Sequence, residues 1–184
     1  MKLFMFVMFA ALLLVGLNSA SAQIPQAIPF AVEVTATPLE ITPTGLSLTG
    51  LQTGTTYTAI PDGAGSLALT PGDPAAVDAA GQADIVGDFN SQILVSFVLP
   101  TRLFPTGGTG AGFVNCRFNN TSAAWGPGGA EVNYFDPRNP TSITLGGDGA
   151  ITIILGGIFE VPGTAGPDVY EGEALVTAQY TGLN

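Results

Sequence analysis

Glycine and proline recur along this chain so often that a long helix is excluded. The 184 residues include 25 glycines and 14 prolines, and both residue types disfavour helix interiors. They leave short apolar segments between turn signals that recur about every 8 to 15 residues. Within these segments apolar and polar residues alternate, as half-buried strands require. The pattern predicts an all-β protein, an antiparallel sandwich or barrel of about ten short strands.

The first 22 residues have the three parts of a secretory signal. Lys2 supplies the positive start, an uninterrupted apolar run covers residues 3–15, and Ala20-Ser21-Ala22 fits the small-x-small cleavage rule. A membrane-spanning helix needs about 20 apolar residues, so the run is too short for one. We expect residues 1–22 to be cleaved and the mature chain to have no membrane span. The chain is then extracellular or on the cell surface, with the periplasm as an alternative.

The charge balance removes whole classes of function. Acidic residues outnumber basic ones 14 to 4, the formal net charge is −10, and there is no histidine. A nucleic-acid partner is excluded because the phosphates would be repelled. The commonest general base and metal ligand is missing. We therefore expect no enzyme and no cofactor, although loop carboxylates leave weak calcium binding open.

Two pairs of carboxylates are the remaining catalytic option. Asp84 and Asp88 are close in sequence, and Glu171 and Glu173 stand two residues apart, so that a strand would point both the same way. Such a pair could hold a cation or act as the acid and base of a glycosidase. The preferred interpretation is a solvated strand face, because exposed acids are the rule.

Cys116 is the only cysteine, so no internal disulfide can form. We expect it to be a small buried residue in a strand. The alternative is an intermolecular disulfide.

Local patterns also assign structure to particular stretches. Residues 92–99 are apolar on both faces, which predicts a central strand. The other assignments are a helical turn within 75–83, a loop over 119–129 that holds Trp125, a hairpin joining 142–145 to 150–155, and a last strand over 169–180.

The C-terminal third carries the most distinctive motif. An apolar strand that starts at Gly149 breaks at Gly156-Gly157, which suggests a bulge or a bend between sheets. Tyr170-Glu-Gly172 then leads to Val176-Thr-Ala-Gln-Tyr180. This part resembles the end of the bacterial exported DUF4402 family, a domain of unknown function. Asp168 stands where the family pattern prefers glycine.

The resemblance covers roughly residues 35–184 and has consequences for fold and function. It implies an immunoglobulin-like β-sandwich, akin to spore-coat and fimbrial subunits, and it brings no catalytic residues. Physical reasoning gives Tyr170, Val176 and Tyr180 a packing role on the inner face of the last strand.

The segment 23–37 is the best candidate for an interaction. Its apolar side chains alternate regularly, at Ile28, Phe30, Val32 and Val34. The strand can complete the sheet of its own domain, residues 38–184. It can equally enter a groove of a second copy that includes strands 92–99 and 169–180, as in strand addition, with Pro38 as the hinge. The near absence of lysine suits self-association, because edge lysines discourage strand pairing.

Two functions follow, and the first is preferred. The chain is expected to be a non-enzymatic structural or surface protein, a homo-oligomer or polymer that forms part of a fibre or envelope. The alternative is an adhesive or carbohydrate-binding module, in which Trp125, Tyr134 and Phe135 stack on surface glycans. Trp125 has a second interpretation as a plug at one end of the sandwich.

Overall fold

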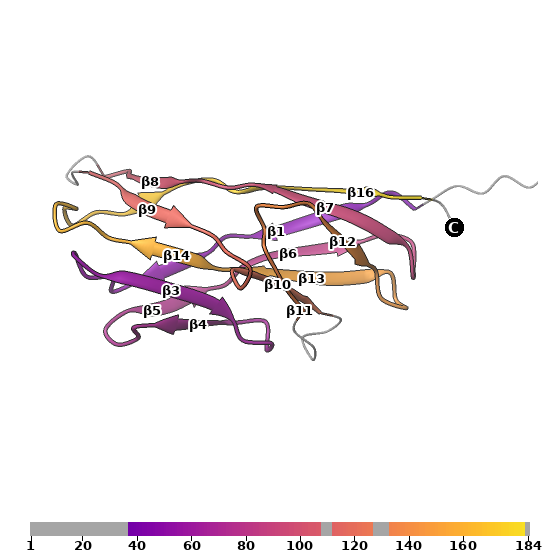
Figure 1. Cartoon of the computed structure of the whole chain (residues 1–184), viewed down its shortest axis with the longest axis horizontal. Helices are drawn as coiled ribbons and strands as arrows, with labels where there is room; N and C mark the ends of the chain where they lie inside the picture. The colour runs from indigo at the N-terminus through magenta and orange to yellow at the C-terminus, as the bar shows by residue number, and fades with distance from the viewer. Residues whose placement is uncertain (1–36, 108–111, 127–132, 183–184) are drawn as a thin grey trace, which may run out of the picture. The chain divides into compact units, whose positions relative to one another are not determined.

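The computed structural model describes residues 37–107, 112–126 and 133–182 (Figure 1). Every described residue lies in one compact unit, Thr35–Asn184. That unit is all-β over its described residues, with sixteen strands and antiparallel pairing throughout. The predicted all-β antiparallel fold class is confirmed, and the strands are shorter and more numerous than expected.

Two sheets enclose the first part of the core. The five-stranded sheet has the order β1 (Glu40–Thr44), β6 (Gly81–Val86), β13 (Ala150–Leu155), β10 (Ala123–Gly126) and β11 (Asn133–Phe135). The three-stranded sheet has the order β12 (Thr141–Thr144), β7 (Gln92–Val98) and β16 (Leu175–Tyr180). β7 is thus the central strand of its sheet, as its apolar sequence predicts.

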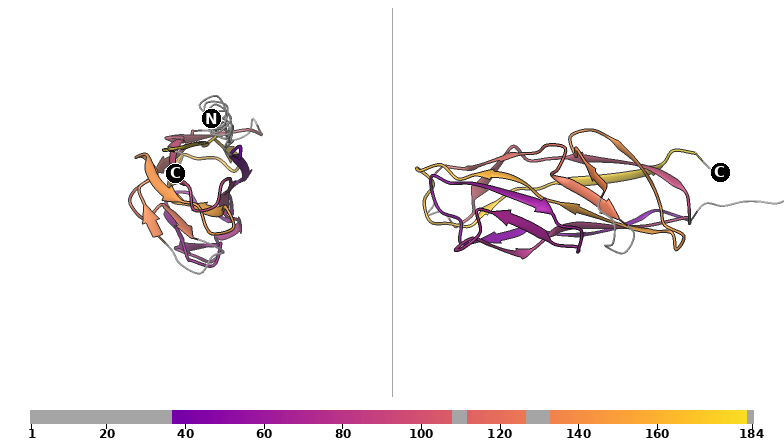
Figure 2. Two further views of the ribbon diagram at one scale, coloured as in Figure 1. Left: turned by 90° about the vertical axis from the view of Figure 1, so that its right-hand side faces the viewer. Right: turned by 60° about the horizontal axis from the view of Figure 1, so that its bottom comes forward.

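Two further sheets complete the unit. The six-stranded sheet has the order β15 (Tyr170–Glu171), β8 (Arg102–Pro105), β9 (Val114–Arg117), β14 (Gly157–Glu160), β3 (Thr56–Pro61) and β4 (Leu67–Thr70). β2 (Ser47–Thr49) and β5 (Ala76–Ala79) form a separate pair. The two views in Figure 2 show how the sheets stack around a common interior.

The buried side chains form two clusters. One lies between the five-stranded and three-stranded sheets and includes Ile93, Val95 and Ile153, all fully buried. The other is built mainly on the six-stranded sheet, around Tyr57. β13 serves both, because Ile153 belongs to the first cluster and its neighbour Ile154 to the second. Successive residues of a strand point to opposite faces, so β13 is covered on both faces at this point.

Gly156 is the point at which the chain changes sheets. β13 ends at Leu155 in the five-stranded sheet, and β14 begins at Gly157 in the six-stranded one. The Gly156 N–H donates to the Ser122 carbonyl at 2.8 Å. A Cβ on Gly156 would collide with the carbonyl oxygen of Ala59. The Gly-Gly break is therefore a bend between sheets, as one of its two interpretations predicts.

Replacing Gly156 with alanine is expected to lower the free energy of unfolding by about 1–3 kcal/mol, because the new methyl group forces two backbones apart. Urea denaturation followed by tryptophan fluorescence measures the change. Gly163→Ala is the matched control, because a Cβ there has no neighbour within 4 Å. Equal stabilities of the two variants would contradict the role given to Gly156.

Two of the sequence-based assignments are wrong for reasons of packing. The stretch 75–83 forms β5 and the start of β6 instead of a helical turn. A Cβ on Gly81 would lie 2.7 Å from the Leu155 carbonyl oxygen, so glycine serves a close approach of strands here. Trp125 lies in β10, between β13 and β11, instead of in a loop. The small residues around it pack in the interior of a sheet.

The predicted hairpin between 142–145 and 150–155 and the predicted single strand over 169–180 are also wrong. The turn after β12 is present, with the Gly146 N–H donating to the Ala150 carbonyl at 3.1 Å. β12 and β13 nevertheless enter different sheets, so they form no hairpin. The expected last strand is divided into β15 and β16. Its break includes Gly172, where a Cβ would lie 2.6 Å from a Leu103 methyl carbon.

Candidate binding groove

A large groove opens between two unpaired strand edges. Among the described residues, β1 pairs only with β6 and β16 only with β7, so each ends its sheet. A groove with a volume of about 960 Å³ lies where the chain continues from β1 into β2 and from β15 into β16, and of the two edges only Pro43 and Thr44 of β1 and Val176 of β16 line it. Its two sides are formed by the β1–β2 segment and by the β15–β16 segment. β2 pairs only with β5 and β15 only with β8 among the described strands, so the backbone along this groove is available to an added strand.

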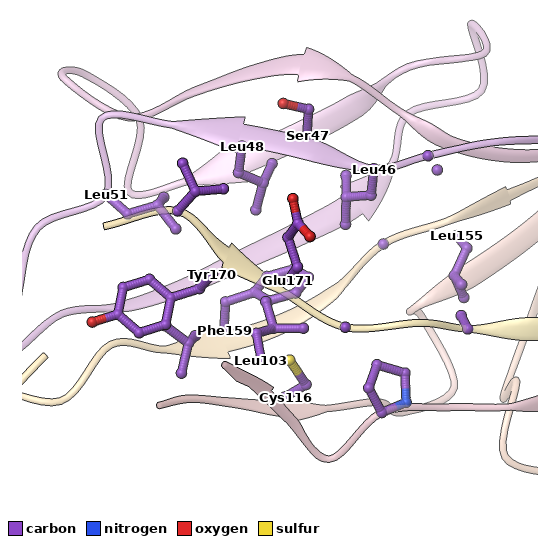
Figure 3. Close-up of a pocket in the computed structure, with 18 of the residues that line it drawn as sticks. Leu46, Ser47, Leu48, Leu51, Leu103, Cys116, Leu155, Phe159, Tyr170 and Glu171 are labelled. Atoms are coloured by element: carbon purple, nitrogen blue, oxygen red, sulfur yellow. The ribbon is translucent and has the colours of Figure 1, made fainter. Parts of the chain in front are cut away.

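The walls of the groove are mostly apolar. Figure 3 shows Leu46, Leu48 and Leu51 on one side, with Phe159 and Leu103 facing them. Phe97 of β7 and Val176 of β16 also line the groove. The two strands that the sequence analysis placed beside a groove thus both contribute to it. The leucines were missed, although their alternate spacing after Pro43-Thr-Gly is visible in the sequence.

Few charged groups border the groove. Among its lining residues the only carboxylates are those of Asp168 and Glu171, and Glu171 is exposed. Figure 3 shows the Glu171 side chain extending toward Leu46 and Leu48. An apolar occupant would therefore remove water from few charged groups of the groove wall.

Cys116 lies in the wall of the groove and is buried. Burial raises the pKa of its thiol to about 12, because the thiolate would lose its hydration. This placement agrees with the expected small buried residue in a strand.

We expect Cys116 to be inert toward a thiol-reactive disulfide reagent at pH 8 while the protein is folded. The thiolate is the reactive form, and a pKa of about 12 leaves almost none of it. Absorbance of the released aromatic thiol measures the rate. The same protein in 8 M urea is the control and should react within minutes. Rapid labelling of the folded chain would contradict the assigned burial.

A set of hydrogen bonds fixes the chain where the described structure begins. The Thr37 N–H donates to a carboxylate oxygen of Asp88 at 3.0 Å, and the Tyr180 hydroxyl donates to the Thr37 carbonyl at 2.8 Å. The same hydroxyl accepts from the Asp88 N–H at 2.7 Å. Hydrogen bonds from Thr37 hold the pKa of Asp88 below its usual value. We call Thr37, Asp88 and Tyr180 the clamp.

The clamp lies at the closed end of the space between β1 and β16. Leu39, Ile41, Ala178 and Tyr180 pack there against the first core cluster. None of them lines the groove, which begins at Pro43 on one side and at Val176 on the other.

The aromatic residues proposed for glycan binding do not share a face. Trp125 and Phe135 pack against the first core cluster, and the Phe135 ring lies 6.2 Å from that of Phe97. Tyr134 is 48 % exposed on the other face of β11. Its hydroxyl donates to the Pro61 carbonyl at 2.7 Å.

The other candidate residues are placed as follows. The proposed self-association residues Ile28, Phe30, Val32 and Val34 lie outside the described residues. Glu171 is in β15 and Glu173 follows it outside a strand, and both are exposed.

Asp84 and Asp88 have different surroundings. Asp84 accepts from the Thr152 hydroxyl at 2.6 Å, whereas Asp88 belongs to the clamp. Within the described ranges no group of three or more potential metal ligands is found.

Comparisons with protein-family models, with curated proteins and with solved structures found no match for this chain. Over the described residues no helix is long and apolar enough to cross a membrane. The resemblance to the DUF4402 family stays a prediction.

Proposed function

We propose that this chain is an exported, non-enzymatic structural subunit that self-associates by strand addition. The N-terminal segment of one copy, with Ile28, Phe30, Val32 and Val34, would enter the groove of the next copy. The apolar groove between the β1–β2 and β15–β16 segments, whose strands leave edges unpaired, carries this proposal. Repetition of the contact would produce a fibre or an envelope layer.

The segment and the groove are complementary in chemistry. An added strand can pair its backbone with an open edge while alternate side chains fill pockets. The segment supplies apolar residues at every second position, and the groove supplies leucines and aromatic rings. Burying one such apolar side chain contributes about 1.5–3 kcal/mol. Four of them therefore contribute enough free energy of association to hold two copies together.

The position of the clamp favours a second copy over the chain's own groove. Thr37 and Pro43 are six positions apart in the sequence, and an extended chain of that length spans about 20 Å. If the segment folded back along β1, Val32 and Val34 would lie beside residues 37–42, which do not line the groove. Leu39 and Ile41 already pack against the core there. The segment of another copy meets no such limit, so all four apolar residues can enter the groove.

Glycan binding by the aromatic residues receives less support. Trp125 and Phe135 contribute to the core cluster, and Tyr134 is directed to the other face of the sheet. A sugar ring stacks on exposed rings that share one surface, and these three do not.

The test is to export the full chain from a bacterial host and measure the mass of the processed protein. Light scattering after size-exclusion chromatography and negative-stain microscopy should show oligomers or filaments for the wild type. The double substitution Phe30→Asp and Val32→Asp should give monomers with an unchanged circular dichroism spectrum. A monomeric wild type would overturn the proposal, as would filaments of the same length from the double variant.

A further inference from the structure

One exposed sheet face carries no charge at all. It is the outer face of the three-stranded sheet, opposite to the side that packs on the core. Its nine side chains are polar but uncharged or apolar: Gln92, Leu94, Ser96, Val98, Ser142, Thr144, Leu175, Thr177 and Gln179. We call this surface the uncharged face. In Figure 1 it belongs to the strands labelled β7, β12 and β16.

Apolar side chains are concentrated at one end of the uncharged face. Val98 and Leu175 are directly opposite each other on β7 and β16, and they are 66 % and 51 % exposed. Phe97, the neighbour of Val98, lines the groove, so Val98 points to the other side. Exposed aliphatic residues side by side favour contact with another surface.

Two hydroxyl groups of the face, those of Ser96 and Thr177, already have partners within it. The hydroxyl oxygens of Ser96 and Thr177 lie 2.7 Å apart across the two strands. The Thr181 hydroxyl donates at this edge to the Gln92 carbonyl at 3.2 Å. A polar group that keeps a hydrogen bond on burial avoids most of the desolvation penalty. The β7 and β16 part of the face can therefore be covered at low cost.

The charge of the whole chain selects the kind of partner. With 14 acidic residues against 4 basic ones, two copies repel each other over most of their surfaces. The uncharged face is a place where they can meet without opposing carboxylates. The cores of protein interfaces are depleted in charged residues, and stacked sheets pack about 10 Å apart.

We propose that the uncharged face is a second self-association surface, on which the three-stranded sheets of two copies pack face to face. β7 has seven residues. The three strands together then cover about 300 Å². Stable interfaces bury about 800 Å² per partner, so an isolated pair associates weakly. In a polymer the face recurs on each subunit, and the weak contacts add along its length.

The test separates this surface from strand addition. The exported full chain carries Phe30→Asp and Val32→Asp, so that the N-terminal segment cannot link copies. Sedimentation velocity from about 10 µM to 1 mM then measures weak association. We expect dimers at the upper concentrations. Raising sodium chloride from 0.05 to 0.5 M should strengthen the association, because salt screens the repulsion between the acidic surfaces.

A matched pair of valine substitutions identifies the face. Val98→Glu should raise the dissociation constant at least tenfold, because it places like charges opposite each other in the interface. Val86→Glu should change it less than twofold, because Val86 is 46 % exposed on the five-stranded sheet instead. Thr177→Glu is a second variant on the face, with the same expectation as Val98→Glu.

Three results would overturn the inference. They are a monomer at every concentration, equal effects of the two valine substitutions, or association that weakens with salt. None of them bears on strand addition, because the N-terminal segment is disabled throughout. Conversely, a wild type that forms no filaments would leave this measurement intact.

Discussion

Mixing two variants that cannot polymerise is expected to produce a dimer that contains one copy of each. The first variant, Phe30→Asp with Val32→Asp, has an intact groove and a disabled segment. The second, Ala174→Trp, has an intact segment and a filled groove, because Ala174 is an exposed residue in the groove wall. At about 10 µM, where the uncharged face does not yet associate, each should be monomeric alone. Together they can form one contact and no more, so light scattering should give twice the monomer mass.

The matched control for the groove variant is Ala68→Trp. Ala68 is exposed on β4, at the edge of the six-stranded sheet, and does not line the groove. This variant should polymerise like the wild type. If the segment filled its own groove, mixing would leave both assembly variants monomeric, and Phe30→Asp with Val32→Asp would instead destabilise the domain. That pattern would contradict exchange between copies.

The largest losses of stability are expected from two adjacent residues. Ile153→Ala and Ile154→Ala should each lower the free energy of unfolding by about 2–5 kcal/mol, because both leave cavities. An ordinary half-buried strand would show one large and one small effect, since its residues alternate between core and solvent. Here Ile153 fills one core cluster and Ile154 the other.

Urea denaturation of both variants measures this expectation. Leu175→Ala, at a side chain that is 51 % exposed, is the control and should change stability by no more than about 0.5 kcal/mol. Assembly is removed with the Phe30→Asp and Val32→Asp background, so that only the domain is measured. A small effect of Ile154→Ala would show that the second cluster contributes little to the stability of β13.

The fold class was predictable because it depends on local signals. Alternating apolar residues and frequent turn residues are visible without any knowledge of the partners of a strand. Residues 92–99 show this in part: β7 is central in its sheet, as predicted, but only one of its two faces is buried, since Val98 on the other face is 66 % exposed. Gly156-Gly157 shows it also, because two glycines in an apolar run indicate a break in pairing.

The errors arose where distant segments decide the structure. Trp125 is surrounded by glycine and proline in sequence, but β13 and β11 hold it in a sheet. The turn at Gly146 resembles that of a hairpin, but pairing of β12 with β7 draws the two strands apart. Local spacing contains no information on which strand lies next to which.

The candidate groove was predictable only in part. Strands 92–99 and 169–180 were expected beside it, and Phe97 and Val176 do line it. The opposite wall, with Leu46 and Leu48, depends on two sheet edges that remain unpaired, which is a property of the tertiary structure. The clamp also joins residues remote in sequence, since Tyr180 and Thr37 are 143 positions apart.

The clamp has a mechanical consequence. A pull on the segment before Thr37 reaches the domain first at Tyr180 and Asp88, and then at the ladder between β1 and β6. β1 has five residue pairs with β6, from Glu40 opposite Val86 to Thr44 opposite Gln82. A force directed along β1 loads these bonds together, whereas a force across it opens them one after another. The direction of the tether would therefore determine how much tension the domain withstands before β1 detaches.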